Sequence, residues 1–238
     1  MLKLFKTITA VSAMALMTAC GGGGGGGGGG ANTTAPVAST SIFPIMTVYM
    51  NTLTSSSSNN YTISGSISGV AIKGSGTVTY GNLSAGTFEG VAAQQRTTTA
   101  TGSVVANGIS IPLNSSSINW VDSNYVPKGS SSGIEYVVVM GTPTIPTAAR
   151  VNDTGTLYTA KRYTNSTKSV LLGTDTATYV LEADTATTAL LTFILTENDN
   201  QGNITSTSTE QLRITPTGTY TSIKDTLLQG TTNITVTY

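Results

Sequence analysis

The fold is decided by the stretch RTTTATGSVVANGISIPL, residues 96–113. Apolar or β-branched residues alternate with small polar ones on both sides of Asn107-Gly108, which is the two-residue period of a half-buried strand. An Asn-Gly pair between two such runs is the strongest short signal for a two-residue hairpin turn. We therefore expect two antiparallel strands, residues 96–106 and 109–113, joined by this turn.

The same alternation continues in both directions from this hairpin. The further expected strands are residues 45–53, 61–67, 73–80, 86–92, 117–122, 134–140, 156–163, 176–182, 189–197, 204–215 and 232–238. Only residues 222–229 could form a helical turn or two. Several short strands separated by turn signals are typical of β-sandwiches or a barrel. We expect an all-β fold, antiparallel and β-sandwich-like, built as one large or two packed β units.

Residues 126–133, VPKGSSSG, have the composition of a linker or a long surface loop. They give the best domain boundary and predict a first β unit over residues 41–128 and a second over residues 133–238. A segment of this length can form one large all-β domain or two domains of about a hundred residues each. The sequence leaves that choice open.

The first thirty residues have a different pattern. Lys3 and Lys6 precede an apolar run, residues 8–17, and Cys20 follows it directly before ten consecutive glycines. Basic, apolar and small-residue regions in this order are typical of an export signal, and the run is too short to span a bilayer, which takes about twenty residues. The segment resembles the signal of bacterial lipoproteins, with Met17-Thr18-Ala19-Cys20 as the lipobox.

This resemblance implies that residues 1–19 are a signal peptide and that Cys20 carries a membrane-anchoring lipid. Because residue 21 is glycine rather than aspartate, it also implies the outer membrane. Lipidation accounts for a lone cysteine, which cannot form an intramolecular disulfide. Glycine loses the most backbone entropy on ordering, so we expect residues 20–40 to be the lipidated cysteine and a flexible tether.

Composition excludes several classes of function. The chain has no histidine, and a lipidated Cys20 leaves no free thiol, which removes the commonest general base and the usual ligands of zinc and haem iron. Signal removal takes Lys3 and Lys6 from 11 basic residues and leaves all 11 acidic ones, for a net charge of −2. Without a basic patch we expect no nucleic-acid partner, and we expect no cofactor, metal or catalytic residue.

Carboxylates are the remaining catalytic groups. A glycosidase needs two that face each other, and Glu182 with Asp184, or Glu197 with Asp199, would share one face of a strand. Residues at this spacing more often mark a strand end that enters a turn. A concave site lined by two or more carboxylates would favour an enzyme or metal site, and the candidates are Glu89, Asp122, Glu135, Asp153, Asp175, Glu182, Asp184, Glu197, Asp199, Glu210 and Asp225.

Three functional hypotheses follow. The first is a lipid-anchored cell-envelope protein with a binding or structural role and no catalysis, whose partner is an envelope protein or a glycan. The second is a small-ligand or glycan-binding barrel, which predicts an apolar cavity of roughly 300 Å³ or more, whereas a filled interior would count against it. It is motivated by Tyr49, Tyr61, Tyr80, Phe88, Trp120 and Tyr136. The third is a carboxylate-dependent hydrolase. The last strand also resembles that of outer-membrane barrels, but its threonines favour an ordinary closing strand.

Overall fold

The computed structural model describes residues 38–238. The expected signal peptide, the lipidation of Cys20 and the tether up to residue 37 lie outside the described residues. Within residues 38–238, no helix has the length and apolar character needed to cross a membrane.

The described residues form one helix and thirteen strands. In chain order they are α2 (Ile45–Thr54), β1 (Ser57–Ile67), β2 (Val70–Tyr80), β3 (Ser84–Phe88), β4 (Val91–Ala106), β5 (Ile109–Val121), β6 (Pro127–Ser132), β7 (Tyr136–Met140), β8 (Thr154–Tyr163), β9 (Leu171–Ala183), β10 (Ala189–Asn198), β11 (Ile204–Ile214), β12 (Tyr220–Gln229) and β13 (Thr232–Thr237). The predicted all-β class is confirmed.

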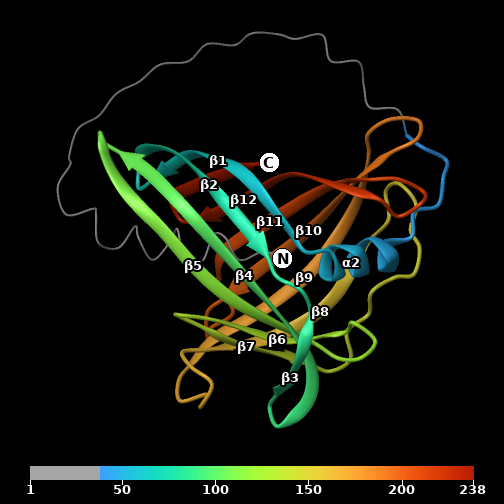
Figure 1. The fold of residues 1–238 in the computed structure, drawn as a ribbon, viewed down its shortest axis with the longest axis horizontal. Helices are drawn as coiled ribbons and strands as arrows, with labels where there is room; N and C mark the ends of the chain where they lie inside the picture. The colour runs from blue at the N-terminus through green and yellow to red at the C-terminus, as the bar shows by residue number, and fades with distance from the viewer. Residues whose placement is uncertain (1–37) are drawn as a thin grey trace.

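Twelve of these strands close into one antiparallel barrel (Figure 1). Each strand from β4 to β13 pairs with the next, β13 pairs with β1, β1 with β2, and β2 returns to β4. Strand β3 pairs only with β4 and lies outside the closed ring. The β-sandwich prediction is therefore wrong. Alternation along a strand is the same in a sandwich and in a barrel, and the pairing of β2 with β4, which removes the free edges, has no sequence signal.

Glycines allow the barrel to close. Gly76 of β2 and Gly102 of β4 are cross-strand partners, and a Cβ on Gly76 would collide with the carbonyl oxygen of Thr101. The side chain of Tyr61 lies beside Gly76, and its Oη donates a hydrogen bond to the same Thr101 oxygen at 3.2 Å. Side chains on the two glycines would prevent this close approach of the two backbones.

The predicted Asn107-Gly108 turn is confirmed, with φ of 50° and 77° at the two residues. Two other segments differ from the prediction. Residues 127–132, expected as a linker or loop, form β6 between β5 and β7 because their backbone pairs on both sides. Residues 222–229, expected as a possible helical turn, belong to β12, whose Asp225 and Leu227 are buried at strand spacing.

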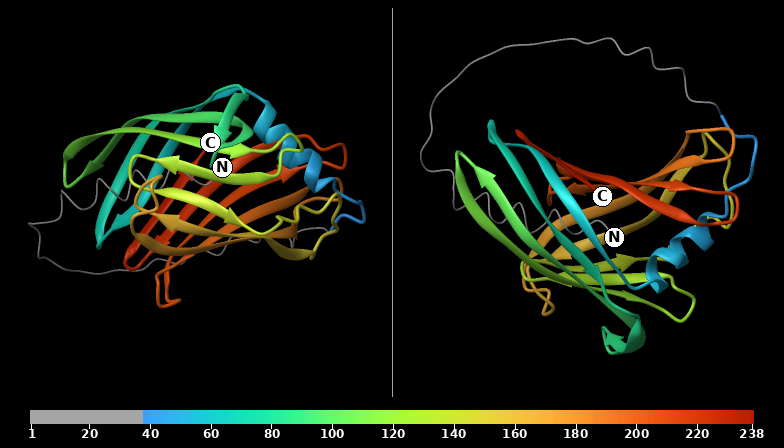
Figure 2. Two further views of the ribbon diagram at one scale, coloured as in Figure 1. Left: turned by 90° about the horizontal axis from the view of Figure 1, so that it is seen from below. Right: turned by 45° about the horizontal axis from the view of Figure 1, so that its top comes forward.

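The segment predicted as the first strand is helix α2. Its buried residues Ile45, Val48 and Thr52 recur at the spacing of three and four that places side chains on one face of a helix. Apolar residues also occupy neighbouring positions, so the segment fits both periods. Tertiary packing decides in favour of the helix, which lies at one end of the barrel (Figure 2).

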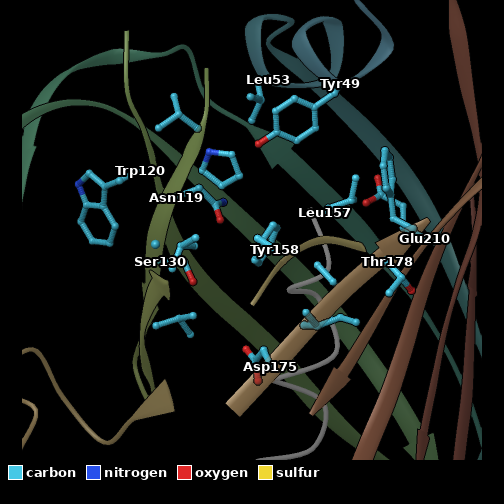
Figure 3. Close-up of a pocket in the computed structure, with 18 of the residues that line it drawn as sticks. Tyr49, Leu53, Asn119, Trp120, Ser130, Leu157, Tyr158, Asp175, Thr178 and Glu210 are labelled. Carbon is cyan, nitrogen blue, oxygen red and sulfur yellow. The ribbon is translucent and has the colours of Figure 1, made fainter. Parts of the chain in front are cut away.

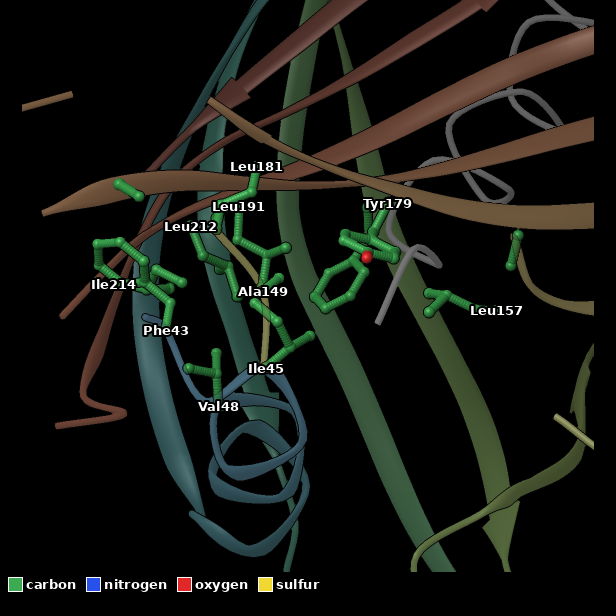
Figure 4. Packing of buried hydrophobic residues seen from close by; sticks show 13 residues of the cluster. Phe43, Ile45, Val48, Ala149, Leu157, Tyr179, Leu181, Leu191, Leu212 and Ile214 are labelled. Atoms are coloured by element: carbon green, nitrogen blue, oxygen red, sulfur yellow. The ribbon is translucent and has the colours of Figure 1, made fainter. Parts of the chain in front are cut away.

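The barrel encloses the main apolar core. Phe43, Ile45 and Val48 pack against strand residues at the α2 end (Figure 4), and the partners labelled there are Ala149, Leu157, Tyr179, Leu181, Leu191, Leu212 and Ile214. A second cluster lies along the inner faces of β1, β2, β4, β5, β12 and β13. A smaller cluster lies on the outside of the barrel, where Phe88 of β3 packs against Trp120 of β5 and Tyr136 of β7.

Candidate functional site

A cavity of about 120 Å³ lies inside the barrel below α2. Figure 3 shows Tyr49 and Leu53 of α2 at one end of this space, Ser130 of β6 on one side and Glu210 of β11 on the other. Asp175 of β9 lies at the end away from the helix in the same view. The helix and seven neighbouring strands, β5 to β11, thus contribute residues to one internal site.

Most of the lining side chains are apolar. These apolar side chains come from α2 and from inward positions of the strands: Leu53, Val121, Val137, Val139, Leu157, Ala177, Phe193 and Leu195. Protein cores contain few voids larger than a water molecule, whereas an apolar cavity of about 150 Å³ can admit benzene. The space in this barrel is therefore close to the size of a compact organic molecule.

A few polar side chains interrupt this apolar lining. The hydroxyl-bearing Tyr49 and Tyr158, the polar Asn119 and Ser130, and the carboxyl groups of Asp175 and Glu210 border the cavity. Burial raises the pKa of Tyr158 to about 12, and it raises the pKa of Tyr49 further. Both phenols therefore stay protonated at neutral pH and can donate hydrogen bonds.

Glu210 and Asp225 form a buried acid pair. They are direct cross-strand partners in β11 and β12, and their exposed fractions are 8% and 5%. Burial is the main cause that raises the pKa of both carboxyl groups, and the charge of Glu210 raises that of Asp225 further. Two like charges opposite each other in an apolar interior are unfavourable, so the pair holds a proton at pH values where isolated carboxyl groups have lost theirs.

Part of this acid pair lacks hydrogen-bond partners. Asp225 Oδ2 accepts a hydrogen bond from Tyr238 Oη at 2.6 Å. Among residues 38–238, Glu210 Oε2 and Asp225 Oδ1 have no hydrogen-bond partner. A buried polar atom without a hydrogen-bond partner lowers the stability of the folded state, so such an atom in a native protein calls for an explanation.

A second charged group surrounds Arg162 of β8. The Arg162 guanidinium lies 2.6 Å from Asp175, 3.1 Å from Glu135 and 3.4 Å from Glu197, and it donates to the Asn198 carbonyl oxygen at 2.9 Å. Burial alone would lower the pKa of Arg162, but the three carboxylates raise it above its ordinary value. Asp175 is therefore held in place at the cavity by an ion pair.

Arg96 of β4 links the barrel wall to helix α2. Its guanidinium donates to the carbonyl oxygens of Thr52 and Ser55 at the C-terminal end of the helix, at 2.7 Å for Ser55, and Nε donates to Gly81 at 3.0 Å. The helix C-terminus carries partial negative charge, which a cation stabilises. Burial lowers the pKa of Arg96.

The two acidic pairs considered from sequence are separated. Glu197 points into the barrel toward Arg162, while Asp199 accepts hydrogen bonds from Gln201 and Asn203 in the following turn. Asp184 pairs with Arg213 at 2.7 Å, and Glu182 is exposed. The cavity instead combines Asp175 and Glu210, both from the candidate set, which the sequence could not pair because they lie on different strands. It therefore meets the condition of two carboxylates in one concave site, under which an enzyme or metal site deserves an assay.

The aromatic candidates divide among three locations. Tyr49 lines the cavity, while Tyr61 and Tyr80 belong to the inner core at the β1–β2 side. Phe88 and Trp120 pack on the outside of the barrel with ring centroids 5.0 Å apart, although the strand of Trp120 borders the cavity. Figure 3 shows the Trp120 ring on the far side of that strand.

Within residues 38–238, no group of three or more histidine, cysteine, aspartate or glutamate side chains is arranged to hold a metal ion. Comparison of the chain with protein-family models, curated protein sequences and solved structures finds no match. The class of protein must therefore be defined by fold and site: an antiparallel β-barrel that encloses a small, largely apolar cavity with acidic groups in its wall.

Proposed function

We propose that this chain is a lipid-anchored envelope protein that binds a small, largely apolar molecule inside its β-barrel. The observation that carries the proposal is the internal cavity of about 120 Å³. Its apolar wall with a few convergent polar groups has the composition of small-molecule sites. The cavity is smaller than the roughly 300 Å³ expected for a ligand-binding barrel, so a compact molecule fits it better than a glycan.

Binding of cyclopentanol, a compact molecule with as many non-hydrogen atoms as benzene, tests this proposal. We expect isothermal titration of the purified protein to give a dissociation constant of about a millimolar or below. Ala177 is buried on the inner face of β9 and lines the cavity, so Ala177→Leu fills part of the space and abolishes binding. Thr176→Leu adds the same side chain at the neighbouring, outward-facing position and leaves binding unchanged.

Absence of binding to the unmodified protein contradicts the proposal. So does binding that Ala177→Leu leaves intact, because the ligand would then lie outside this cavity.

The membrane anchor is part of the same proposal. It rests on Met17-Thr18-Ala19-Cys20 and on the lone cysteine of the chain. In a bacterial host that processes lipoproteins, we expect Cys20→Ser to abolish incorporation of a labelled fatty acid and to release the chain from the outer membrane. Labelling that persists in Cys20→Ser, or an unlabelled unmodified chain, contradicts the anchor.

We propose binding rather than catalysis for the carboxylates. Asp175 is held by Arg162, and Glu210 shares its surroundings with Asp225, so neither is arranged as a free base. Turnover of an aryl glycoside by the purified protein that is lost in Glu210→Gln would establish the hydrolase hypothesis instead.

A further inference from the structure

We infer that the cavity selects a small organic cation, an amine with a compact apolar body, and that the Glu210 carboxylate is its counter-ion. This inference rests on the proposed function, because it names the ligand class of the same cavity. The position of Glu210 carries the inference. Glu210 lines the cavity, and only 8% of it is exposed. Its terminal oxygen Oε2 has no hydrogen-bond partner among residues 38–238.

The two arginines described inside the barrel make their hydrogen bonds and ion pairs with groups other than Glu210, although the charge of Arg96 partly offsets the rise that burial causes in the pKa of Glu210. Arg96 donates to backbone carbonyl oxygens of α2 and of Gly81, and Arg162 pairs with three other carboxylates. Within the described part of the chain, no Lys or Arg nitrogen lies within ion-pair distance of Glu210. A cation from outside would therefore complete a site that the described residues leave incomplete.

The interior also carries an excess of acidic groups. Among residues 38–238, Glu210 and Asp225 are two buried acidic side chains for which no Lys or Arg side chain provides an ion pair. An excess of buried negative charge attracts a cation and disfavours an anion of the same shape. The wall thus discriminates by charge as well as by size.

The apolar lining of the cavity determines the uncharged part of the ligand. Phe193 of β10 is the direct cross-strand partner of Glu210 and borders the same cavity. An ammonium group bound to Glu210 would lie next to this ring, whose face attracts cations. Leu157 and Leu195 provide apolar surface for a hydrocarbon body. Inorganic cations lack such a body, so we expect an organic amine to bind more tightly than ammonium ion.

Three probes of one shape separate the contributions of charge and size: cyclopentylamine, cyclopentanol and cyclopentanecarboxylate. By isothermal titration at neutral pH we expect the amine to bind about tenfold more tightly than the alcohol, the gain of one charge-assisted hydrogen bond, and the carboxylate to bind most weakly. Glu210→Gln should remove the preference for the amine over the alcohol, since it removes the charge and keeps the shape of the side chain. Glu182→Gln, at an exposed position, is the matched control and should change neither.

The amine must also bind more tightly as pH rises. Among residues 38–238, the groups that interact electrostatically with Glu210 are Asp225 and Tyr220 of β12, Tyr80 of β2, Arg96 of β4 and Tyr158 of β8. Tyr80, Tyr158 and Tyr220 have raised pKa values and stay protonated, whereas burial raises the pKa of both carboxyl groups of the acid pair above the ordinary carboxyl range. We expect amine affinity to rise with pH as the pair loses its proton, with proton release on binding, and alcohol affinity to stay constant.

The possible results distinguish the two proposals. If cyclopentanol binds in the cavity and the amine binds no more tightly, or if Glu210→Gln retains the preference for the amine, the inference is wrong and the proposed function stands. If none of the three probes binds, the proposed function itself fails. A preference for the amine that depends on Glu210 and rises with pH supports both.

Discussion

Glu210 and Asp225 make the interior of the barrel sensitive to pH. Both carboxyl groups have a raised pKa in the folded protein, chiefly because they are buried. The folded state therefore binds protons more tightly than the unfolded state. Their contribution to stability is full below the pKa of an unfolded carboxyl group, about 4, and is lost as pH rises through the folded pKa values.

Replacement of Asp225 by asparagine tests this dependence. We expect Asp225→Asn to unfold at a temperature several degrees higher than the unmodified protein at pH of about 8, a gain of about 1–2 kcal/mol, and to match it near pH 4. Thermal unfolding followed by circular dichroism across this pH range provides the measurement. Glu182→Gln is the control and should keep the unmodified pH profile. A loss of stability in Asp225→Asn at pH of about 8 would contradict the acid-pair interpretation.

Arg162 gives the opposite prediction, because its removal takes away the guanidinium that three carboxylates of the barrel interior share. Asp175, Glu135 and Glu197 all lie within 3.4 Å of its guanidinium. We expect Arg162→Met to lower the free energy of unfolding by about 3–5 kcal/mol at neutral pH in urea denaturation. The loss should shrink in acid, where the carboxylates are protonated. Lys161→Met, at the adjacent outward-facing position, should have little effect, and a similar loss in both variants would contradict this role.

At the scale of elements, helix α2 closes one end of the barrel and, with β6 and β12, is one of three elements that sequence reasoning missed. The stretch 45–53 has apolar residues on both the strand and the helix period, and only packing of Phe43, Ile45 and Val48 into the barrel end selects the helix. The strands were predictable because each presents one buried face, as in Tyr61, Ile63 and Ile67 of β1.

Strand partners were less predictable than the strands themselves. Glu210 and Asp225 are 15 residues apart in sequence and become neighbours through the β11–β12 register, which includes a bulge at Gln211/Leu212. Asp175 of β9 and Glu210 of β11 border one cavity, with one strand, β10, between them. Periodicity reports which face of a strand is buried, but it carries no information on long-range pairing, and so the site remained hidden.

Arg96 should hold α2 in place. Its hydrogen bonds to the carbonyl oxygens of Thr52 and Ser55 are charge-assisted, and such bonds contribute about 1.5–3 kcal/mol. We expect Arg96→Gln to accelerate hydrogen exchange of the α2 amides by about tenfold or more while β9 and β10 keep their protection. Arg213→Gln, which removes an arginine from the outer ion pair with Asp184, should leave α2 unchanged. Equal hydrogen exchange of the α2 amides in both variants would contradict the role of Arg96 in holding α2 in place.

At the scale of the whole molecule, closure of the barrel depends on the β2–β4 seam. Gly76 and Gly102 face each other there, beneath Tyr61. We expect Gly76→Ala to lower the free energy of unfolding by more than about 2 kcal/mol in urea denaturation, since the new Cβ would collide with backbone and with the Tyr61 hydroxyl. Gly133→Ala is the control, because no atom lies within 4 Å of its added Cβ. Equal stability of the two variants would contradict the claim that barrel closure depends on the β2–β4 seam.

The closed barrel also provides the internal space on which the functional account depends. The most direct test is methyl-resolved NMR of the purified protein titrated with cyclopentylamine. We predict shift changes and ligand contacts at the lining methyl groups of Leu157, Val137 and Leu195, with none at the exposed Val91 and Ile204. Contacts only at exposed methyl groups, or no change at the lining ones, would contradict the account that the barrel interior is a cation-selective binding site.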